Sequence, residues 1–226
     1  MPAKPAPAAA RTMKPPRYHD VAELIERFGG IPPERIRMTP FPGTATEADL
    51  NSPLGKGCEL LDGTLVEKVM GSKEGFFGMN LGRLIGNHVE ANSLGVVLGG
   101  DGEIRLGPGL VRKPDVTFIP WESFPDAGIP DEVYWTVAPG LVVEVLSRWN
   151  TTQEIDRKLA EFFAVGCKIA WVIDPPTRTA KVYTSAKRFK LLDDTGVLDG
   201  GRVVPGFSIP LADVLTLPVR PKRKGR

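Results

Sequence analysis

The most apolar strand-like run of the chain, residues 141–147, carries a carboxylate at its centre, Glu144. Side chains alternate between the two faces of a strand, so Glu144 shares a face with Val142 and Leu146. An unpaired charge in such a packed region is costly, and Glu144 therefore requires compensation, for which a metal ion is one candidate. A buried salt bridge, or an exposed position at the end of the strand, is the alternative.

The elements that follow this run indicate a crossover between parallel strands. Residues 154–165 have the apolar periodicity of a helix, and residues 168–173 are predicted to form the next strand. A strand–helix–strand unit of this kind joins two parallel strands of one sheet. Elsewhere, Asp62-Gly63 is a strong hairpin signal between two short strands. The pattern predicts an α/β or mixed α+β fold, in which a mixed β-sheet is flanked by helices and extended by β-hairpin additions.

Basic residues gather at the two ends of the chain. Nine of the 29 Lys and Arg residues lie in 1–17 and 219–226, which carry no acid, so the body is acidic although the formal net charge is +2. We expect residues 1–17 to be a disordered basic tail rich in Pro and Ala, and 219–226 to be a second basic tail. An N-terminal helix and connecting arm is predicted over 18–56, and the main domain over 57–218. The acidic body argues against a broad basic nucleic-acid surface, whereas the tails could contact phosphates or merely keep the protein soluble.

Several classes of protein are disfavoured by composition. No apolar run approaches the about 20 residues that a membrane-spanning helix needs, and the N-terminal segment has no apolar core of a secretory signal. The two cysteines, Cys58 and Cys167, form no Cys-x-x-Cys pair, and only His19 and His88 are present, without the spacing of zinc ligands. Free thiols fit a reducing compartment. The sequence thus predicts a cytoplasmic protein with no membrane partner.

Asp115 and Lys158 complete a candidate site with Glu144. Asp115 stands at the head of an apolar run, Val116 to Ile119, within a predicted strand over 111–119, and Lys158 lies at the edge of the buried stripe of the helix over 154–165. Mg²⁺ prefers one or two carboxylates together with water and phosphate oxygens. A lysine beside such a metal site can orient the attacking water or stabilise charge in the transition state. If the two strands are adjacent, the three residues form a site for phosphodiester chemistry.

Simpler roles compete for these positions. Glu154 and Lys158 could form an exposed i,i+4 ion pair, and Thr151 with Glu154 fits a capping box that starts the helix. Ser147 and Asn150, at the turn before that helix, could hydrogen-bond the site, but local capping hydrogen bonds are the favoured interpretation. A serine hydrolase built on Ser147 is disfavoured, because no Gly-x-Ser-x-Gly turn surrounds it.

Several sequence blocks carry a family resemblance. They include RKPDVTFIPW, then PGLVVEVLSRWNTTQEIDRKLAEFFAVGCKIAWVIDPPTRTAKVYTS, then DGGRVVPGFSIPLADVL, with ERFGGIPPERIR and CELLDGTLVEKVMG upstream. Over about residues 20–217 the chain resembles the Uma-type putative restriction endonuclease family, including its longer bacterial members. That family is placed in the PD-(D/E)XK nuclease superfamily. The resemblance implies a restriction-endonuclease-like core and an endonuclease, a hydrolase that cleaves DNA with Mg²⁺, for which Mn²⁺ is the expected substitute.

The resemblance also implies roles for single residues. Asp115 matches the first motif acid and Glu144 the second, and both are expected to bind the metal. The simple motif would place lysine at Leu146, so this chain departs from it; in this family a residue from the following helix, here Lys158, takes that catalytic role. The superfamily often adds an earlier glutamate. Glu74 is the expected catalytic candidate, and Glu59 in the hairpin strand is the weaker one.

Two functions follow from these observations. The first is a DNA endonuclease in which Asp115 and Glu144 share a metal ion. The second is a catalytically inactive nuclease fold that serves as a binding or regulatory module, with its acids ion-paired to Arg or Lys. Cutting both strands of DNA would be served by a homodimer, although no sequence feature demonstrates one.

Overall fold

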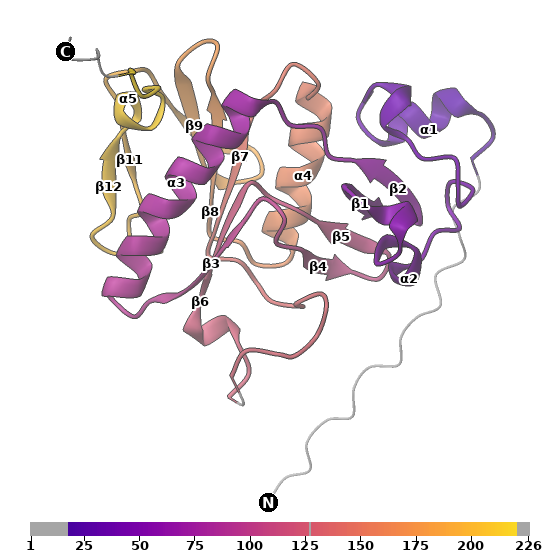
Figure 1. The fold of residues 1–226 in the computed structure, drawn as a ribbon, viewed down its shortest axis with the longest axis horizontal. Coiled ribbons are helices and arrows are strands. Elements are labelled where there is room, and N and C mark those ends of the chain that lie inside the picture. Colours follow the sequence, from indigo (N-terminus) through magenta and orange to yellow (C-terminus); the bar gives the residue numbers. More distant parts are fainter. Residues whose placement is uncertain (1–17, 127, 221–226) are drawn as a thin grey trace, which may run out of the picture.

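The computed structural model describes residues 18–126 and 128–220. The predicted tail over 1–17, and all but the first two residues of the tail over 219–226, lie outside this part of the chain. The described strands form sheets of six, four and two strands, in a mixed α/β arrangement (Figure 1). None of the helices within the described residues is long and apolar enough to cross a membrane.

The six-stranded sheet has the order β10-β9-β8-β7-β6-β3. Its strands are β3 (Gly95–Gly99), β6 (Val116–Pro120), β7 (Leu141–Val145), β8 (Ile169–Asp174), β9 (Thr179–Ser185) and β10 (Arg188–Leu192). Neighbours pair antiparallel except for β7 and β8, which are parallel. Helix α4 (Thr152–Ala164) connects these two strands, so the predicted crossover is confirmed.

The four-stranded sheet has the order β2-β1-β5-β4 and lies beside the large one (Figure 1). It contains β1 (Cys58–Leu61), β2 (Thr64–Glu67), β4 (Ile104–Gly107) and β5 (Leu110–Arg112), and the Asp62-Gly63 hairpin joins β1 to β2 as predicted. The two-stranded sheet pairs β11 (Val197–Asp199) with β12 (Ser208–Pro210). The remaining α-helices of the described residues are α1 (Val21–Arg27), α2 (Glu47–Leu50), α3 (Ser72–Ala91) and α5 (Leu211–Val214).

The strand predicted over 111–119 is divided in two. Its first part is β5 of the small sheet and its second part is β6 of the large sheet. Pro114 explains the break, because proline has no N–H to donate to a ladder of hydrogen bonds. The segment 113–115 therefore carries the chain from one sheet to the other, and Asp115 lies at this junction.

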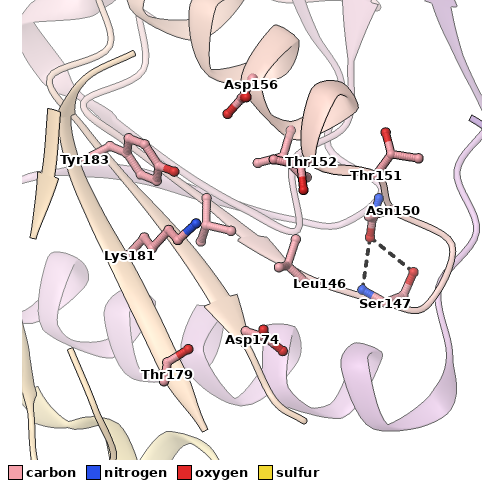
Figure 2. A pocket seen from close by; sticks show the side chains of 12 residues that line it. Leu146, Ser147, Asn150, Thr151, Thr152, Asp156, Asp174, Thr179, Lys181 and Tyr183 are labelled. Carbon is pink, nitrogen blue, oxygen red and sulfur yellow. Dashed lines mark hydrogen bonds between the residues drawn. The ribbon is translucent and has the colours of Figure 1, made fainter. Parts of the chain in front are cut away.

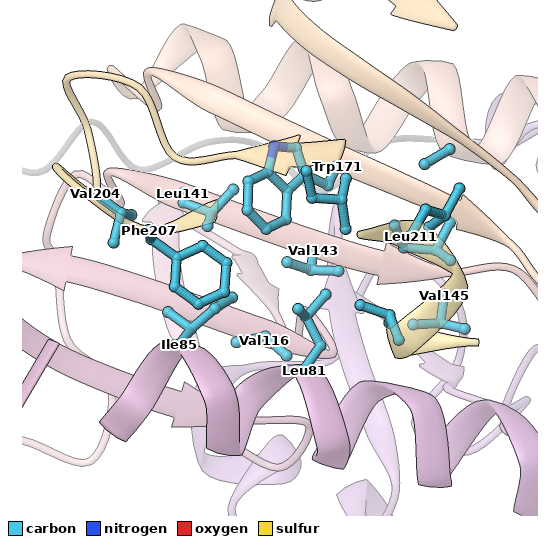
Figure 3. Close-up of a cluster of buried hydrophobic side chains, with 14 of the residues drawn as sticks. Leu81, Ile85, Val116, Leu141, Val143, Val145, Trp171, Val204, Phe207 and Leu211 are labelled. Atoms are coloured by element: carbon cyan, nitrogen blue, oxygen red, sulfur yellow. The ribbon is translucent and has the colours of Figure 1, made fainter. Parts of the chain in front are cut away.

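The large sheet is covered on both faces. In Figure 1, α3 crosses one face and α4 lies on the other. Leu81 and Ile85 of α3 pack with Val143 and Trp171 of the sheet in the core that Figure 3 shows. The opposite core gathers residues of α4 with β7 and β8, among them Val142, Ile155, Leu159, Phe162 and Val172. The predicted alternation of β7 is thus confirmed.

Helix α3 approaches the start of β6 through two glycines. A Cβ added at Gly82 would lie 3.3 Å from Cγ2 of Val116, and one at Gly78 would lie 3.5 Å from Cβ of Asp115. Larger side chains at these positions would push the helix away from the sheet, since interiors are packed to the density of organic crystals. The spacing of α3 glycines therefore keeps this helix close to the junction.

Replacing Leu81 by Ala should lower the free energy of unfolding by about 3 kcal/mol, because a fully buried side chain on α3 leaves a cavity. Urea unfolding followed by circular dichroism measures this change. Met79→Ala is the matched control on the same helix, where the side chain is 69% exposed and the expected change is within about 0.5 kcal/mol. Equal losses in the two variants would contradict the packing described for α3.

Candidate functional site

Asp115 is fixed against the neighbouring strand. β6 pairs with β7, so Asp115, one residue before β6, lies beside the end of β7. Its Oδ2 accepts a hydrogen bond of 2.7 Å from the N–H of Val145, and the residue is 4% exposed. The expectation that Asp115 and Glu144 come from adjacent strands is confirmed.

Glu144 is paired with Lys158. The Nζ of Lys158 lies 3.1 Å from both carboxylate oxygens of Glu144, and the two residues are 2% and 5% exposed. Lys158 thus reaches from α4 over the sheet, as predicted. The alternative ion pair with Glu154 is wrong, because both oxygens of Glu154 bind the guanidinium of Arg35, at 2.7 and 3.0 Å.

Glu59 brings the small sheet into the same cluster. Its Oε1 lies 3.7 Å from Nζ of Lys158 and accepts a hydrogen bond of 3.0 Å from the N–H of Lys113. Its Oε2 accepts a bond of 2.7 Å from Arg112, whose side chain is almost fully buried. Lys158 is therefore placed between an acid of the large sheet, Glu144, and an acid of the small one.

Lys68 neutralises Asp115. Its Nζ lies 2.7 Å from Oδ1 of Asp115 in an ion pair, and it donates hydrogen bonds to the carbonyl oxygens of Lys113 (2.6 Å) and Gly100 (3.3 Å). Three carboxylates and three cations thus meet at the junction of the sheets, and Arg112 also pairs with Glu161 at 2.7 Å. This charge cluster consists of Asp115, Glu144, Glu59, Lys68, Lys158 and Arg112.

Glu74, the favoured early glutamate, lies elsewhere. It is in the first turn of α3, where it is half-buried, and its carboxylate folds back against the backbone of Gly71. An acid at the start of a helix is stabilised by the helix dipole, which gives Glu74 a local role. Among the described residues, Glu59 is the early glutamate that enters the charge cluster, and a catalytic role of Glu74 stays a prediction.

The pKa values of the two buried glutamates, Glu144 and Glu59, are shifted in opposite directions. Burial raises the pKa of Glu144 to about 7, with a further contribution from Asp115, against the opposing effect of Lys158. Burial also acts to raise the pKa of Glu59, but Lys158 and Arg112 outweigh it and hold that pKa at about 2. Glu59 is therefore the more firmly ionised carboxylate of the two.

Lys158 remains a cation in this surrounding. Burial acts to lower the pKa of Lys158, but the carboxylates of Glu144 and Glu59 outweigh burial and raise it above its usual value. A protonated amine donates hydrogen bonds and positive charge, and it does not accept a proton. The arrangement therefore suits Lys158 to charge stabilisation.

A groove leads to Asp115 from the surface. It has a volume of about 300 Å³ and lies between α3 and the edge strand β3. Its lining residues are Met70, Gly75, Gly78, Met79, Gly82, Arg83, Gly86, Val97, Leu98, Gly99, Gly100 and Asp115. The groove is largely apolar, with Arg83 as its one cationic lining residue. Of the charge cluster, Asp115 is the member that this groove reaches.

A second pocket, of about 130 Å³, lies beyond the ends of β7 and β8 at the start of α4 (Figure 2). Lys181 and Tyr183 line it from β9, and no member of the charge cluster does. Ser147 donates to Oδ1 of Asn150 through both its backbone N–H and its hydroxyl, as Figure 2 shows. The local capping role expected for these two residues is confirmed, and neither His19 nor His88 lines this pocket.

The charge cluster offers oxygen ligands for a hard cation. Within residues 18–126 and 128–220, no group of three or more His, Cys, Asp or Glu side chains is arranged to hold a metal ion. The carboxylate and the two carbonyl oxygens that surround Nζ of Lys68 nevertheless form a donor set of the type Mg²⁺ uses, and an ammonium group lies among them. Asp115 supplies the carboxylate of this set, whereas the carboxylate of Glu144 contacts Lys158.

Comparison with known proteins gives the family. The model of the Uma2 family, described as putative restriction endonuclease, matches residues 48–212, well over half of the chain. The chain belongs to the Uma2 family. This match confirms the resemblance derived from the sequence blocks, and it includes every member of the charge cluster. No curated protein matches the chain.

The fold of this Uma2 chain is shared with a solved structure. It is similar to the crystal structure of a putative nuclease belonging to DUF820 from Anabaena variabilis ATCC 29413, with a TM-score of 0.65 and 17% sequence identity. The similarity covers 75% of this chain and 96% of that chain. At this identity the likeness shows the fold, and it confirms the predicted restriction-endonuclease-like mixed α/β core.

Lys68 and Arg112 are members of the cluster that the sequence did not indicate. Arg112 follows an apolar residue of a short strand, and Lys68 follows directly after β2. A buried arginine requires a carboxylate partner. The presence of Arg112 and Glu59 in two short apolar strands was therefore the sequence signal that could have predicted their ion pair. No local signal exists for Lys68, because its partners lie more than 30 residues away in the chain.

Replacing Glu59 by Gln should lower the free energy of unfolding by about 3 kcal/mol near neutral pH. This is the free energy that corresponds to lowering the pKa of Glu59 from 4.5 to about 2, at about 1.4 kcal/mol for each pKa unit. Because the folded pKa lies below the unfolded one, this contribution is present above about pH 4.5 and is lost as the pH falls toward about 2. Urea unfolding of both proteins between pH 7 and pH 3 measures the difference. A difference that does not shrink on acidification, or an equal effect of Glu74→Gln, would contradict the assignment of Glu59.

Proposed function

We propose that this protein is a metal-dependent endonuclease that hydrolyses phosphodiester bonds of DNA. The observation that carries the proposal is the convergence of Asp115, Glu144 and Lys158 in one buried cluster, in a chain of the Uma2 family. Two carboxylates and a lysine on neighbouring elements fit the requirements of metal-assisted hydrolysis. Mg²⁺ is the proposed ion, with Mn²⁺ as its substitute.

Asp115 and Glu144 are the proposed metal ligands. The Val145 N–H holds Oδ2 of Asp115 in one orientation, which reduces the reorganisation that metal binding requires. When bound, Mg²⁺ neutralises charge on the phosphate and activates water. The carbonyl oxygens near Asp115, water and substrate phosphate oxygens would complete its ligands.

Lys158 is proposed to stabilise negative charge on the phosphate or to orient the attacking water. Its amine is fixed by Glu144 on one side and by Glu59 on the other, so its position is set before substrate arrives. Glu59 is proposed to act by positioning Lys158. Glu74, the other candidate that the resemblance implies, has no ion pair with Lys158 among the described residues.

DNA is proposed to reach Asp115 along the groove between α3 and β3. Arg83 lines this groove and carries the positive charge that a phosphate would contact. The basic residues of the two ends, of which only Arg220 lies in the described part of the chain, would add contacts that do not depend on base sequence. Pairing of two copies for double-strand cleavage remains a prediction.

The second candidate function is an inactive nuclease fold used as a binding module. The observation that favours it is that both acids are ion-paired, Asp115 with Lys68 and Glu144 with Lys158. Fold and family membership do not establish turnover. Cleavage by the purified protein separates the two functions.

Purified protein with Mg²⁺ or Mn²⁺ should cleave DNA, and Asp115→Asn and Glu144→Gln should each lower the rate by about a hundredfold or more, since each removes a proposed metal ligand. The assay follows conversion of supercoiled plasmid to nicked and linear forms, with single-stranded DNA and RNA as comparison substrates. Glu74→Gln should retain the activity of the original protein.

Equal cleavage by the original protein and by both ligand variants would overturn the proposed site. Absence of cleavage by the folded original protein on all three substrates, with either metal, would favour the inactive module. Loss of activity in Glu74→Gln with a normal circular dichroism spectrum would restore Glu74 as a catalytic candidate.

A further inference from the structure

Lys68 lies in a cradle made by three separate segments of the chain. It follows β2 directly, and its backbone N–H donates to the carbonyl of Gly57 at 2.9 Å, which directs the residue toward the junction of the sheets. Its Nζ contacts Oδ1 of Asp115 and the carbonyl oxygens of Lys113 and Gly100, at 2.7, 2.6 and 3.3 Å. A carboxylate and two carbonyls are the oxygen types that surround hard divalent cations in proteins.

We propose that the ammonium group of Lys68 holds the cation position beside Asp115, and that a divalent metal binds only when Lys68 leaves it. This inference rests on the proposed function, because it concerns the metal that Asp115 would bind. An ammonium and a metal ion cannot both contact Oδ1 of Asp115 at bonding distance within the same cradle. The two cations therefore compete for one position.

Lys68 is placed to leave, in contrast with Lys158. The side chain of Lys68 is 13% exposed and pairs with one carboxylate, whereas that of Lys158 is 3% exposed and pairs with two. Gly100, whose carbonyl belongs to the cradle, also lines the groove between α3 and β3. A Cβ added at Gly100 would lie 3.6 Å from Nζ of Lys68. A flexible four-carbon stem can carry the ammonium toward that groove.

The competing explanation is a permanent structural ion pair. In that case Lys68 would neutralise Asp115 at all times, because a buried carboxylate without a partner is strongly destabilising. Metal would then not bind at Asp115, and the fold would serve as the inactive module. The two explanations differ in what happens to metal affinity when Lys68 is removed.

The test is calorimetric titration of Mn²⁺ into the full-length protein, Lys68→Met and Lys113→Met. Lys113 is the matched control, because it carries the same charge two residues from Asp115, is 12% exposed, and pairs with Glu103 at 2.6 Å instead of with Asp115. If Lys68 occupies the cradle in about nine of ten molecules, its removal should tighten Mn²⁺ binding about tenfold. Lys113→Met should change the affinity far less.

A second measurement uses the unaltered protein, which keeps the proposal testable if Lys68→Met fails to fold. Acetylation of each lysine by an activated ester is followed by peptide mass spectrometry, without and with saturating Mn²⁺. Release from the cradle should speed the acetylation of Lys68 several-fold, while Lys113 and Lys158 should react at unchanged rates. Unchanged or slower acetylation of Lys68 in a protein that binds Mn²⁺ would overturn the proposal.

The outcomes separate this inference from the proposed function. Mn²⁺ binding to the original protein that Lys68→Met leaves equal or weaker, or that both lysine variants tighten equally, overturns the role of Lys68 alone. Binding by Lys68→Met and not by the original protein would mean that Lys68 does not leave the cradle, which overturns its displacement and favours the inactive module. Absence of Mn²⁺ binding in all three folded proteins overturns the metal site and, with it, the competition.

Discussion

The ion pairs of Lys158 link the two sheets of this protein. Lys158 extends from α4 to Glu144 of the large sheet and lies 3.7 Å from Glu59 of the small one. Removal of Lys158 would leave the buried carboxylate of Glu144 without its ion pair, at a cost of about 3–5 kcal/mol. The same contacts that hold α4 across the junction also fix the amine for chemistry. Structural and proposed catalytic requirements thus fall on one side chain.

The junction itself exists because the chain changes sheets at residues 113–115. Pro114 interrupts the ladder, so β5 ends and β6 begins in the other sheet. Asp115 is thereby placed next to the end of β7, where a main-chain N–H fixes one oxygen. Gly78 lets α3 approach this point closely and helps to line the groove that reaches Asp115. A break in a strand is therefore what creates the candidate site.

The two lysines of the cluster have different surroundings and, on our proposals, different roles. Lys158 is enclosed by two carboxylates, so it stays in place and stays charged. Lys68 is held by one carboxylate and two carbonyls beside an open groove. Ion-paired acids are compatible with a nuclease and with an inactive module, so the ion pairs alone do not separate the two functions. What separates them is whether the lysine beside Asp115 can leave. An occupied cation position is compatible with a metal site only if its occupant can be displaced.

The sequence by itself determined the elements whose signals are local. Alternation and helical spacing act over a few residues, so the sequence predicted the two faces of β7, the buried stripe of α4 and the crossover to β8. From these elements followed the face of β7 on which Glu144 lies and the direction of Lys158 over the sheet. The family blocks marked Asp115 and Glu144. Only the tertiary structure decided that residues 111–119 belong to two sheets, that Glu59 and not Glu74 joins the cluster, and that Lys68 meets Asp115. These contacts join residues far apart in the chain, and an ion pair between distant segments leaves no periodic pattern in the sequence of either segment.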